Sequence, residues 1–336
     1  MGRSVRVRVR WRRQPAHTPD FCTRVLRGLG QVVFQANPWT GGVFVVALCV
    51  ADWRYAAYAV GGAALGTWTA RGLGVSPDRQ EAGLEGFNSA LLALCLAVFL
   101  DRDRPATALL AAAGCIVVTI GTAATVRLLS AWNLPPLTLP YCLVAVSVTV
   151  AAPAFRRVWP HEGSLAALPG PASGHGTLHP DDLVRAFLHN VSQIFFLELW
   201  HVGALLLAGI FLASKAAGLV VCAGSLTAVV TAWALGAPAE RIADGTMGYN
   251  AVLVALALCG VFLPATPATL LYALLGAATA TALTPAVAAL LAPSGGHAFT
   301  WPFVLTTLGF LAASPSFPRL TGTKSDADTV CPTRAA

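Results

Sequence analysis

Charged side chains are scarce in this chain. Asp, Glu, Lys and Arg make up 11% of its 336 residues, whereas hydrophobic residues make up 56%. In soluble domains about a quarter of the residues are charged. So few charges cannot cover a surface that faces water, and this excludes an ordinary soluble globular protein. The apolar segments also lack the polar face that an amphipathic surface helix carries.

Motifs for metal binding and catalysis are also missing. The eight cysteines form no C-x-x-C pair, and most of them lie inside apolar segments, where cysteine behaves as a small hydrophobic residue. The apolar segments contain no phosphate-binding lysine loop, no H-E-x-x-H and no Ser/His/Asp cluster. We therefore expect no metal, no cofactor and no disulfide framework, and we do not expect an enzyme.

What the chain has instead is a series of apolar segments along almost its whole length. Several reach the roughly 20 residues that a helix needs to span the hydrocarbon of a bilayer, and others are shorter and interrupted by Gly or Pro. This pattern predicts an all-α polytopic membrane protein surrounded by lipid. The segments are 41–52, 55–71, 84–100, 105–128, 139–155, 202–214, 217–235, 248–263, 267–291 and 301–314.

Positive charge is concentrated at the amino terminus. Residues 1–28 hold eight arginines against one acidic residue, Asp20. A basic tail can bind nucleic acid, but beside a membrane span it is better explained by the excess of Lys and Arg on the cytoplasmic side. We expect no nucleic-acid partner and place the amino terminus in the cytoplasm. The tail has no apolar region and cleavage site of its own, so it does not resemble a secretory signal peptide.

The sequence repeats itself at a constant offset of 162 residues. "GLEGFNSALLAL" at 83–94 aligns with "GTMGYNAVLVAL" at 245–256, and "LTLPYCL" at 137–143 aligns with "FTWPFVL" at 299–305. "QVVF" at 31–34 aligns with "QIFF" at 193–196, again without a gap. Three matches in one register indicate a tandem duplication.

The duplication suggests how the chain is organised. A stretch rich in Pro, Gly, His and Ser divides the two copies, and each copy holds about five spans plus a shorter helix. An odd number of crossings turns the second copy upside down, and inverted repeats place a solute site near the midplane, between interrupted helices. The interrupted helices could lie at 22–36 and 184–199 or at 128–138. The expected parts are a basic tail (1–21), a first repeat (22–155), a linker (156–183), a second repeat (184–315) and a carboxy-terminal tail (316–336).

Polar residues that recur in both copies are the candidates for solute contact, because buried polar groups in a membrane are costly unless they are satisfied. All of them are neutral, and aromatic residues accompany them. Phe34 and Phe196 each stand three residues after a glutamine, a spacing that predicts the same helical face. Amide and hydroxyl acceptors between aromatic faces suit a flat, uncharged solute that donates hydrogen bonds. We expect the two asparagines, which follow a glycine closely, to brace a turn instead. The pairs are Gln31/Gln193, Phe34/Phe196, Phe87/Tyr249, Asn88/Asn250 and Thr138/Thr300.

Together these segments resemble the urea transporters of bacteria and vertebrates. The resemblance covers about 22–315 and rests on the duplicated Gly-Phe-Asn segment, on "QANPWTGG" and on "LPPLTLPY" with its partner "TWPF". The family signature Leu-Pro-x-x-Thr-x-Pro-Phe is met at 134–141, with Tyr141 in the last place. In the second copy only the Thr-x-Pro-Phe end survives.

The resemblance implies a homotrimer in the cell membrane, with both termini cytoplasmic and one pore in each subunit that conducts urea passively. Ammonia or another small neutral amide remains an alternative solute on the same fold. The two implied sites are Gln31, Val32, Phe34 and Phe87, and Gln193, Ile194, Phe196 and Tyr249; Leu91 and Leu253 would narrow the centre beside Thr138 and Thr300.

Overall fold

The computed structural model describes residues 19–159, 166 and 179–321. Helices make up this part of the chain, and it contains no strand. The basic tail up to residue 18, most of the linker, and residues 322–336 lie outside the described residues. The predicted all-helical class is therefore confirmed for the described part of the chain.

Several helices of the first half begin where the sequence offers a cap. The side chain of Asp20 accepts a hydrogen bond from the Thr23 amide, and the side chain of Asn37 accepts one from the Trp39 amide. Pro38 and Pro105 open their helices, where proline costs no hydrogen bond. The helices are α1 (Phe21–Gln31), α2 (Pro38–Ala51), α3 (Trp53–Gly72), α4 (Pro77–Glu81), α5 (Phe87–Phe99), α6 (Pro105–Ser130) and α7 (Leu139–Ala151).

The second half follows the same order. A short 3-10 helix (Gln193–Phe195) continues α8. After α12 the helical geometry breaks at Cys259 and Gly260, whose backbone angles are not helical. The helices are α8 (Pro180–Ser192), α9 (Trp200–Ala213), α10 (Lys215–Ala234), α11 (Ala239–Ala243), α12 (Tyr249–Leu256), α13 (Pro267–Leu291), α14 (Trp301–Ala313) and α15 (Pro318–Thr321).

The offset of 162 residues recurs in the backbone conformation. Left-handed φ values, which most residues avoid, occur in pairs at this offset, and among the described residues Gly260 alone lacks a partner. Three of the five pairs are identical residues, and in the other two the conformation is shared although the residues differ, which supports the duplication beyond sequence identity. The pairs are Phe34/Phe196, Gly74/Gly236, Gly83/Gly245, Asn133/Gly295 and Leu137/Phe299.

A close backbone approach is repeated as well. A side chain at Gly41 would overlap the Leu26 carbonyl oxygen, and one at Gly203 would overlap the Leu188 carbonyl oxygen. Leu188 is the residue 162 positions after Leu26. These two glycines let α2 cross α1 and α9 cross α8 at equivalent points, so the Gly survives in the second half although most of the surrounding motif does not.

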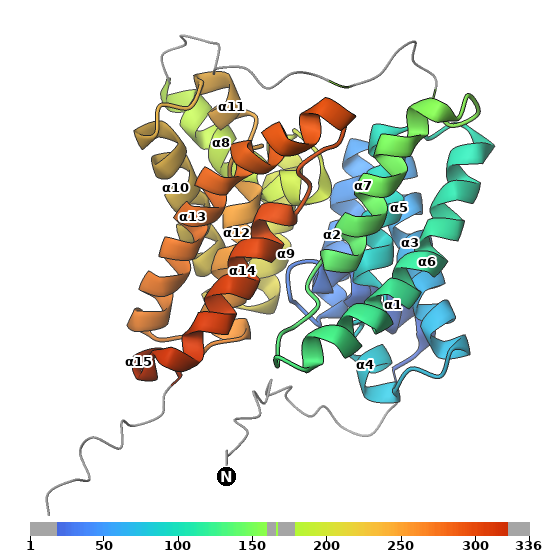
Figure 1. The fold of residues 1–336 in the computed structure, drawn as a ribbon, viewed down its shortest axis with the longest axis horizontal. Helices are drawn as coiled ribbons and strands as arrows, with labels where there is room; N and C mark the ends of the chain where they lie inside the picture. Colours follow the sequence, from blue (N-terminus) through green and yellow to red (C-terminus); the bar gives the residue numbers. More distant parts are fainter. Residues whose placement is uncertain (1–18, 160–165, 167–178, 322–336) are drawn as a thin grey trace, which may run out of the picture.

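The two halves lie side by side, with α1 to α7 on one side of the molecule and α8 to α15 on the other (Figure 1). Equivalent short helices lie at opposite ends in this view, α4 at the lower end and α11 at the upper end. Helix α5 packs against α3 and α6, and α12 packs against α10 and α13, so each half has its apolar core around one central helix. Between the halves, α2 packs against α9.

Three described helices are long and apolar enough to cross a membrane, at Pro105–Ser130, Lys215–Ala234 and Pro267–Ser294. A fourth span is possible if α8 and α9, which are bent by 75° at their break, are counted as one. Other apolar helices, including α2, α5 and α7, are shorter. The bend lies within 184–199, one of the alternative positions considered for an interrupted helix, whereas the count of about five spans in each half stays a prediction.

Candidate functional site

Two threonines from opposite halves meet between the halves. Thr138 precedes the first residue of α7 and Thr300 precedes that of α14, and their Oγ1 atoms are 2.7 Å apart. Both residues are buried, with exposed fractions of 4% and 1%. The sulfur of Cys142, one turn into α7, lies 3.1 Å from the Thr300 hydroxyl. Two residues that are 162 positions apart thus form one polar contact in an apolar surrounding.

Two asparagines hold the chain in place just before these threonines. Asn88 Nδ2 donates to the Leu137 carbonyl at 3.4 Å, and Asn250 Nδ2 donates to the Phe299 carbonyl at 3.3 Å. Leu137 and Phe299 have left-handed φ values of 49° and 41°, a conformation that non-glycine residues rarely adopt without support. The asparagines therefore brace a turn, but it is the turn before the threonines, 49 residues further along the chain, and not the turn beside their own glycines that the sequence indicates.

The paired glutamines are held in matching ways. Gln31 Nε2 donates to the Ala82 carbonyl at 2.7 Å, and Gln193 Nε2 donates to the Asp244 carbonyl at 2.9 Å. No hydrogen bond to either amide oxygen is found among the described residues. Each amide group thus uses a donor on a backbone carbonyl, which fixes its orientation, while its oxygen keeps its capacity to accept hydrogen bonds.

The expectation that Phe34 follows Gln31 on the same helical face is wrong. Helix α1 ends at Gln31, and Phe34 has a φ of 61°, so its side chain leaves the direction that a continued helix would give it. Phe196 has a φ of 63° and departs from helical geometry in the same way. The aromatic side chains are therefore placed by a left-handed turn and by their partners.

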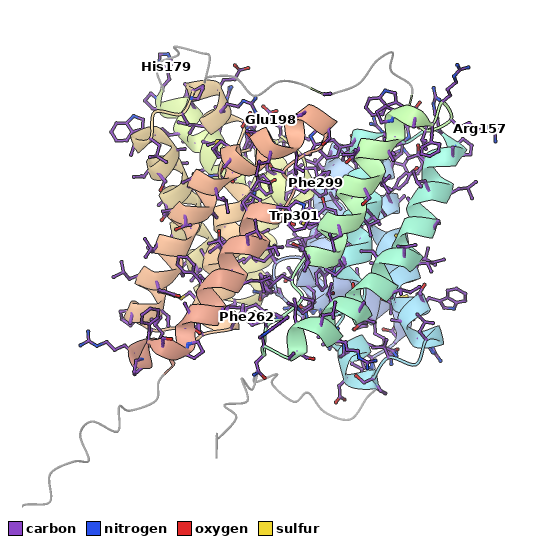
Figure 2. All side chains as sticks on the ribbon, viewed as in Figure 1. Arg157, His179, Glu198, Phe262, Phe299 and Trp301 are labelled. Carbon is purple, nitrogen blue, oxygen red and sulfur yellow. The ribbon has the colours of Figure 1, made fainter. Side chains whose placement is uncertain are left out.

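Those partners come from the opposite half. The Phe34 ring contacts Phe303 and Phe262, with ring centres 6.2 Å and 5.8 Å away. The Phe196 ring contacts Tyr141 and Phe99, both at 6.0 Å. Each aromatic group thus joins the turn of one half to helices of the other. Figure 2 shows Phe262 nearer the lower end of the molecule and Phe299 nearer the upper end, so the two groups lie at different depths.

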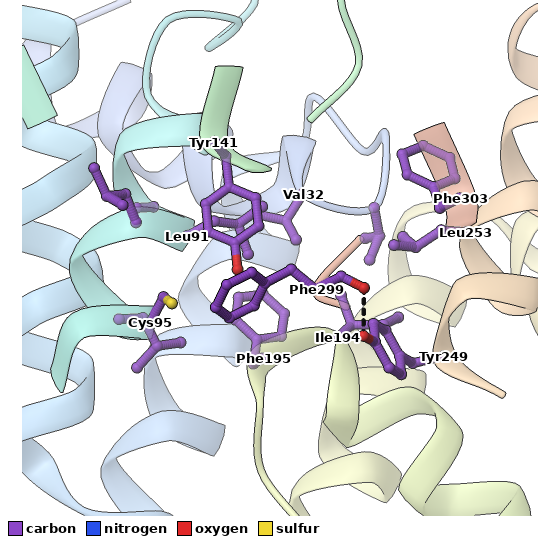
Figure 3. Packing of buried hydrophobic residues seen from close by; sticks show 14 of the residues in the cluster. Val32, Leu91, Cys95, Tyr141, Ile194, Phe195, Tyr249, Leu253, Phe299 and Phe303 are labelled. Carbon is purple, nitrogen blue, oxygen red and sulfur yellow. Dashed lines mark hydrogen bonds between the residues drawn. The ribbon is translucent and has the colours of Figure 1, made fainter. Parts of the chain in front are cut away.

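The remaining predicted residues occupy equivalent places. Phe87 and Tyr249 are the first residues of α5 and α12, and Leu91 and Leu253 follow one turn later with exposed fractions of 1% and 2%. The Tyr249 hydroxyl donates to the Phe299 carbonyl (Figure 3). Tyr249 therefore strengthens the brace that Asn250 provides, which agrees with the expectation that a buried phenol finds a partner.

The last two predicted residues, Val32 and Ile194, directly follow the glutamines. They are packed into the apolar core with exposed fractions of 3% and 1%. Their side chains are apolar, so any side-chain contact with a solute at these positions is apolar.

Comparison with known proteins shows the family of this chain. The sequence model of the family described as "Urea transporter" matches residues 22–315, which include both halves. Urea transporter 1 of sheep (Ovis aries) is 30% identical over 312 residues, which are 92% of this chain and 81% of the sheep protein. Urea transporter 1 of mouse (Mus musculus) is 30% identical over 314 residues, with the same two shares. The chain belongs to the urea transporter family. As a member of that family it is a membrane protein.

Sequence reasoning missed several of the aromatic residues. Phe303 and Tyr141 are paired by the same offset as Thr138 and Thr300, and both stand at the end of the family's Thr-x-Pro-Phe motif. Their periodic pairing could have drawn attention to them. Phe99 and Phe262 lie outside the exact offset and belong to irregular ends of α5 and α12, so no sequence signal marks them.

One acidic residue lies close to one of the paired glutamines, Gln193. Asp244, in the connection between α11 and α12, offers its carbonyl to Gln193 and its carboxylate to the Thr246 hydroxyl and amide. Burial raises the pKa of Asp244, although the hydrogen bonds from Thr246 and the charge of Arg241 act against this. Its counterpart in the first half is Ala82, so a carboxyl group borders only one of the two glutamines.

Proposed function

We propose that this urea transporter family member conducts urea passively along a path between its two halves. The observation that carries the proposal is the contact between Thr138 and Thr300, flanked by two glutamines whose oxygens are free to accept hydrogen bonds. A urea molecule has four N–H donors in a plane. When urea leaves solution, each donor loses its hydrogen bond to water and needs another acceptor. Neutral oxygens along a narrow path can do this without holding the solute too tightly.

The residues of this path are those that the sequence predicts. The glutamine and phenylalanine of each half would receive urea at either end, and the leucines and threonines would form the narrow centre. Support comes from their matching positions in the two halves and from the aromatic contacts that join the halves. The proposed path residues are Gln31, Val32, Phe34, Phe87, Leu91, Thr138, Gln193, Ile194, Phe196, Tyr249, Leu253 and Thr300.

The electrostatics of the buried region support passive conduction. Glu85 is the one buried acidic residue in the described part of the chain, with an exposed fraction of 4%. Its carboxylate forms an ion pair with Arg79 at 2.6 Å. A carboxylate that is neutralised by an arginine in a turn before α5 cannot carry protons along the path. Coupling to a proton gradient would need a titratable group that faces the solute, and the proposed path offers neutral groups only.

The proposal includes the architecture around the path. Residues 22–155 and 184–315 would be inverted repeats of about five spans each plus a short helix, in the arrangement that places a solute site near the midplane. The opposite positions of α4 and α11 support the inversion (Figure 1). Three such subunits would form a homotrimer in the cell membrane, with one path in each subunit and both termini in the cytoplasm.

A solute-flux measurement tests the proposed function. The purified protein is placed in liposomes, and shrinkage and swelling are followed by stopped-flow light scattering under gradients of urea, formamide and ammonia. We expect urea to cross much faster than in protein-free liposomes. Urea flux equal to that of protein-free liposomes would contradict the proposal, and rapid flux of ammonia alone would assign the path to that alternative solute.

A further inference from the structure

One buried hydroxyl near the proposed path has no nitrogen or oxygen partner among the described residues. Tyr141 is completely buried, and its hydroxyl oxygen has no hydrogen-bond partner among the described residues. The thiol of Cys95 lies beside it, but thiols form only weak hydrogen bonds. A buried phenol without a partner loses the hydrogen bonds it makes with water in the unfolded chain. Such a group is expected where something other than the protein completes its hydrogen bonding.

The backbone places Tyr141 next to the proposed path. It lies three residues after Thr138, so it shares the face of α7 on which Thr138 meets Thr300. Its ring lies 6.0 Å from that of Phe196 and 5.8 Å from that of Phe299. Figure 3 shows the hydroxyl pointing away from its own helix toward Phe299, which belongs to the other half.

The equivalent position in the second half carries no hydroxyl. Phe303, 162 residues later, packs its ring against Phe34 at 6.2 Å, in the same relation as Tyr141 to Phe196. The family motif also ends in phenylalanine, so a phenyl ring alone is sufficient for the packing. The hydroxyl of Tyr141 is therefore an addition to one end of the path and not a requirement of the aromatic contact.

Donors are few at this end of the path. Gln193 uses one of its two amide N–H groups on the Asp244 carbonyl, and Tyr249 uses its hydroxyl on the Phe299 carbonyl. Besides the second N–H of Gln193, these groups offer acceptors for the N–H groups of urea rather than a donor for its carbonyl oxygen. The O–H of Tyr141 is a donor with only the weak Cys95 thiol beside it, and the Tyr141 ring packs against that of Phe196 in the same aromatic group.

We propose that the Tyr141 hydroxyl is a specificity-determining contact that donates a hydrogen bond to the carbonyl oxygen of urea at the Phe196 end of the path. This deepens the proposed function and rests on it. The contact favours solutes that have a carbonyl oxygen, such as urea and formamide, over ammonia, which has none. Because Phe303 offers no hydroxyl, urea is held more firmly at the Phe196 end than at the Phe34 end.

The experiment compares Tyr141→Phe with the unchanged protein in liposomes. Urea flux is measured over a range of urea concentrations, ammonia flux is measured alongside, and the melting temperature is recorded without solute. We expect the half-saturating urea concentration to rise about fivefold, the effect of losing one hydrogen bond. Ammonia flux should stay the same. The melting temperature should stay the same or rise, because the hydroxyl has no partner to lose.

Two further variants make the result decisive. Tyr272→Phe removes a phenol that is not part of the proposed path and that donates a hydrogen bond of 2.8 Å to the Phe310 carbonyl. This variant should lower the melting temperature without changing the half-saturating urea concentration. Cys95→Ala removes the neighbouring thiol. If Tyr141→Phe and Cys95→Ala both lower the melting temperature while urea saturation is unchanged, the hydroxyl serves packing and the inference is wrong. Absence of urea flux in the unchanged protein would instead contradict the proposed function itself.

Discussion

The hydroxyl oxygens of Thr138 and Thr300 lie 2.7 Å apart, although the two residues are separated by 162 positions and belong to different halves of the molecule. A hydroxyl has one donor and two acceptor sites. When one threonine donates to the other, the pair keeps one free donor and several free lone pairs. The pair can therefore stay bonded to itself and still offer hydrogen bonds to a passing solute.

Replacing these threonines by valine should slow urea without unfolding the protein. Each single substitution, Thr138→Val or Thr300→Val, leaves the other hydroxyl buried without its partner, at a cost of about 1–3 kcal/mol in the free energy of unfolding. The double variant removes both polar groups and should be more stable than the sum of the single losses predicts. Urea flux should fall roughly tenfold in each single variant, since about 1.4 kcal/mol corresponds to one decade in rate.

Thermal unfolding in detergent and liposome flux measure the two effects separately. Strictly additive losses of stability would show that the two hydroxyls do not interact. Unchanged urea flux in both single variants would place the narrowest part of the path elsewhere.

Tyr249→Phe should affect stability more than transport. The Tyr249 hydroxyl donates to the Phe299 carbonyl and so supports the left-handed turn before Thr300. Loss of this bond should lower the free energy of unfolding by about 1 kcal/mol. Urea flux should stay within about twofold, because the hydroxyl is engaged with the backbone. A many-fold change in flux at an unchanged melting temperature would instead show that this hydroxyl contacts the solute.

Asp244→Asn should raise the melting temperature at neutral pH and lose this gain in acid. Burial raises the pKa of Asp244 in the folded protein above its ordinary value of 3.8. A group whose pKa is higher in the folded protein than in the unfolded chain stabilises the folded state when it is protonated. This contribution is complete at pH values below the pKa in the unfolded chain, and it is lost as the pH rises through the pKa in the folded protein. Asparagine is neutral at every pH and keeps the oxygen that Thr246 contacts.

Melting temperatures of Asp244→Asn and the unchanged protein are therefore compared between neutral pH and about pH 4. The difference should be largest at neutral pH and small at the acid end. A variant that is less stable across the whole range would mean that the carboxylate makes favourable contacts that outweigh its burial.

The sequence alone was sufficient to find the residues that the two halves share. Gln31 and Gln193, or Thr138 and Thr300, are recognisable because a polar residue recurs at a fixed offset in an apolar chain. This recurrence can be read from a single sequence. The bracing role of Asn250 was predictable only in part, because its place near Gly248 indicates a local turn, whereas the turn that it braces, at Phe299, lies 49 residues further along the chain.

Contacts between the halves could not be predicted in the same way. The spacing of three residues predicts that Phe34 shares a helical face with Gln31. In the structure its left-handed φ of 61° turns the ring toward Phe303 and Phe262 of the other half. Position 34 is not a glycine, the residue that usually indicates a left-handed turn in a sequence. The partner rings are hundreds of positions away in the chain, and only packing of the complete molecule determines them.

The most direct test of the account is the steady-state distribution of labelled urea across liposomes that contain the purified protein. A path with neutral groups only can equalise urea but cannot concentrate it. We predict that the internal urea concentration rises to the external value and stops there, with or without an imposed proton gradient, and that a protonophore changes nothing. Accumulation above the external concentration that collapses when the protonophore is added would contradict passive conduction.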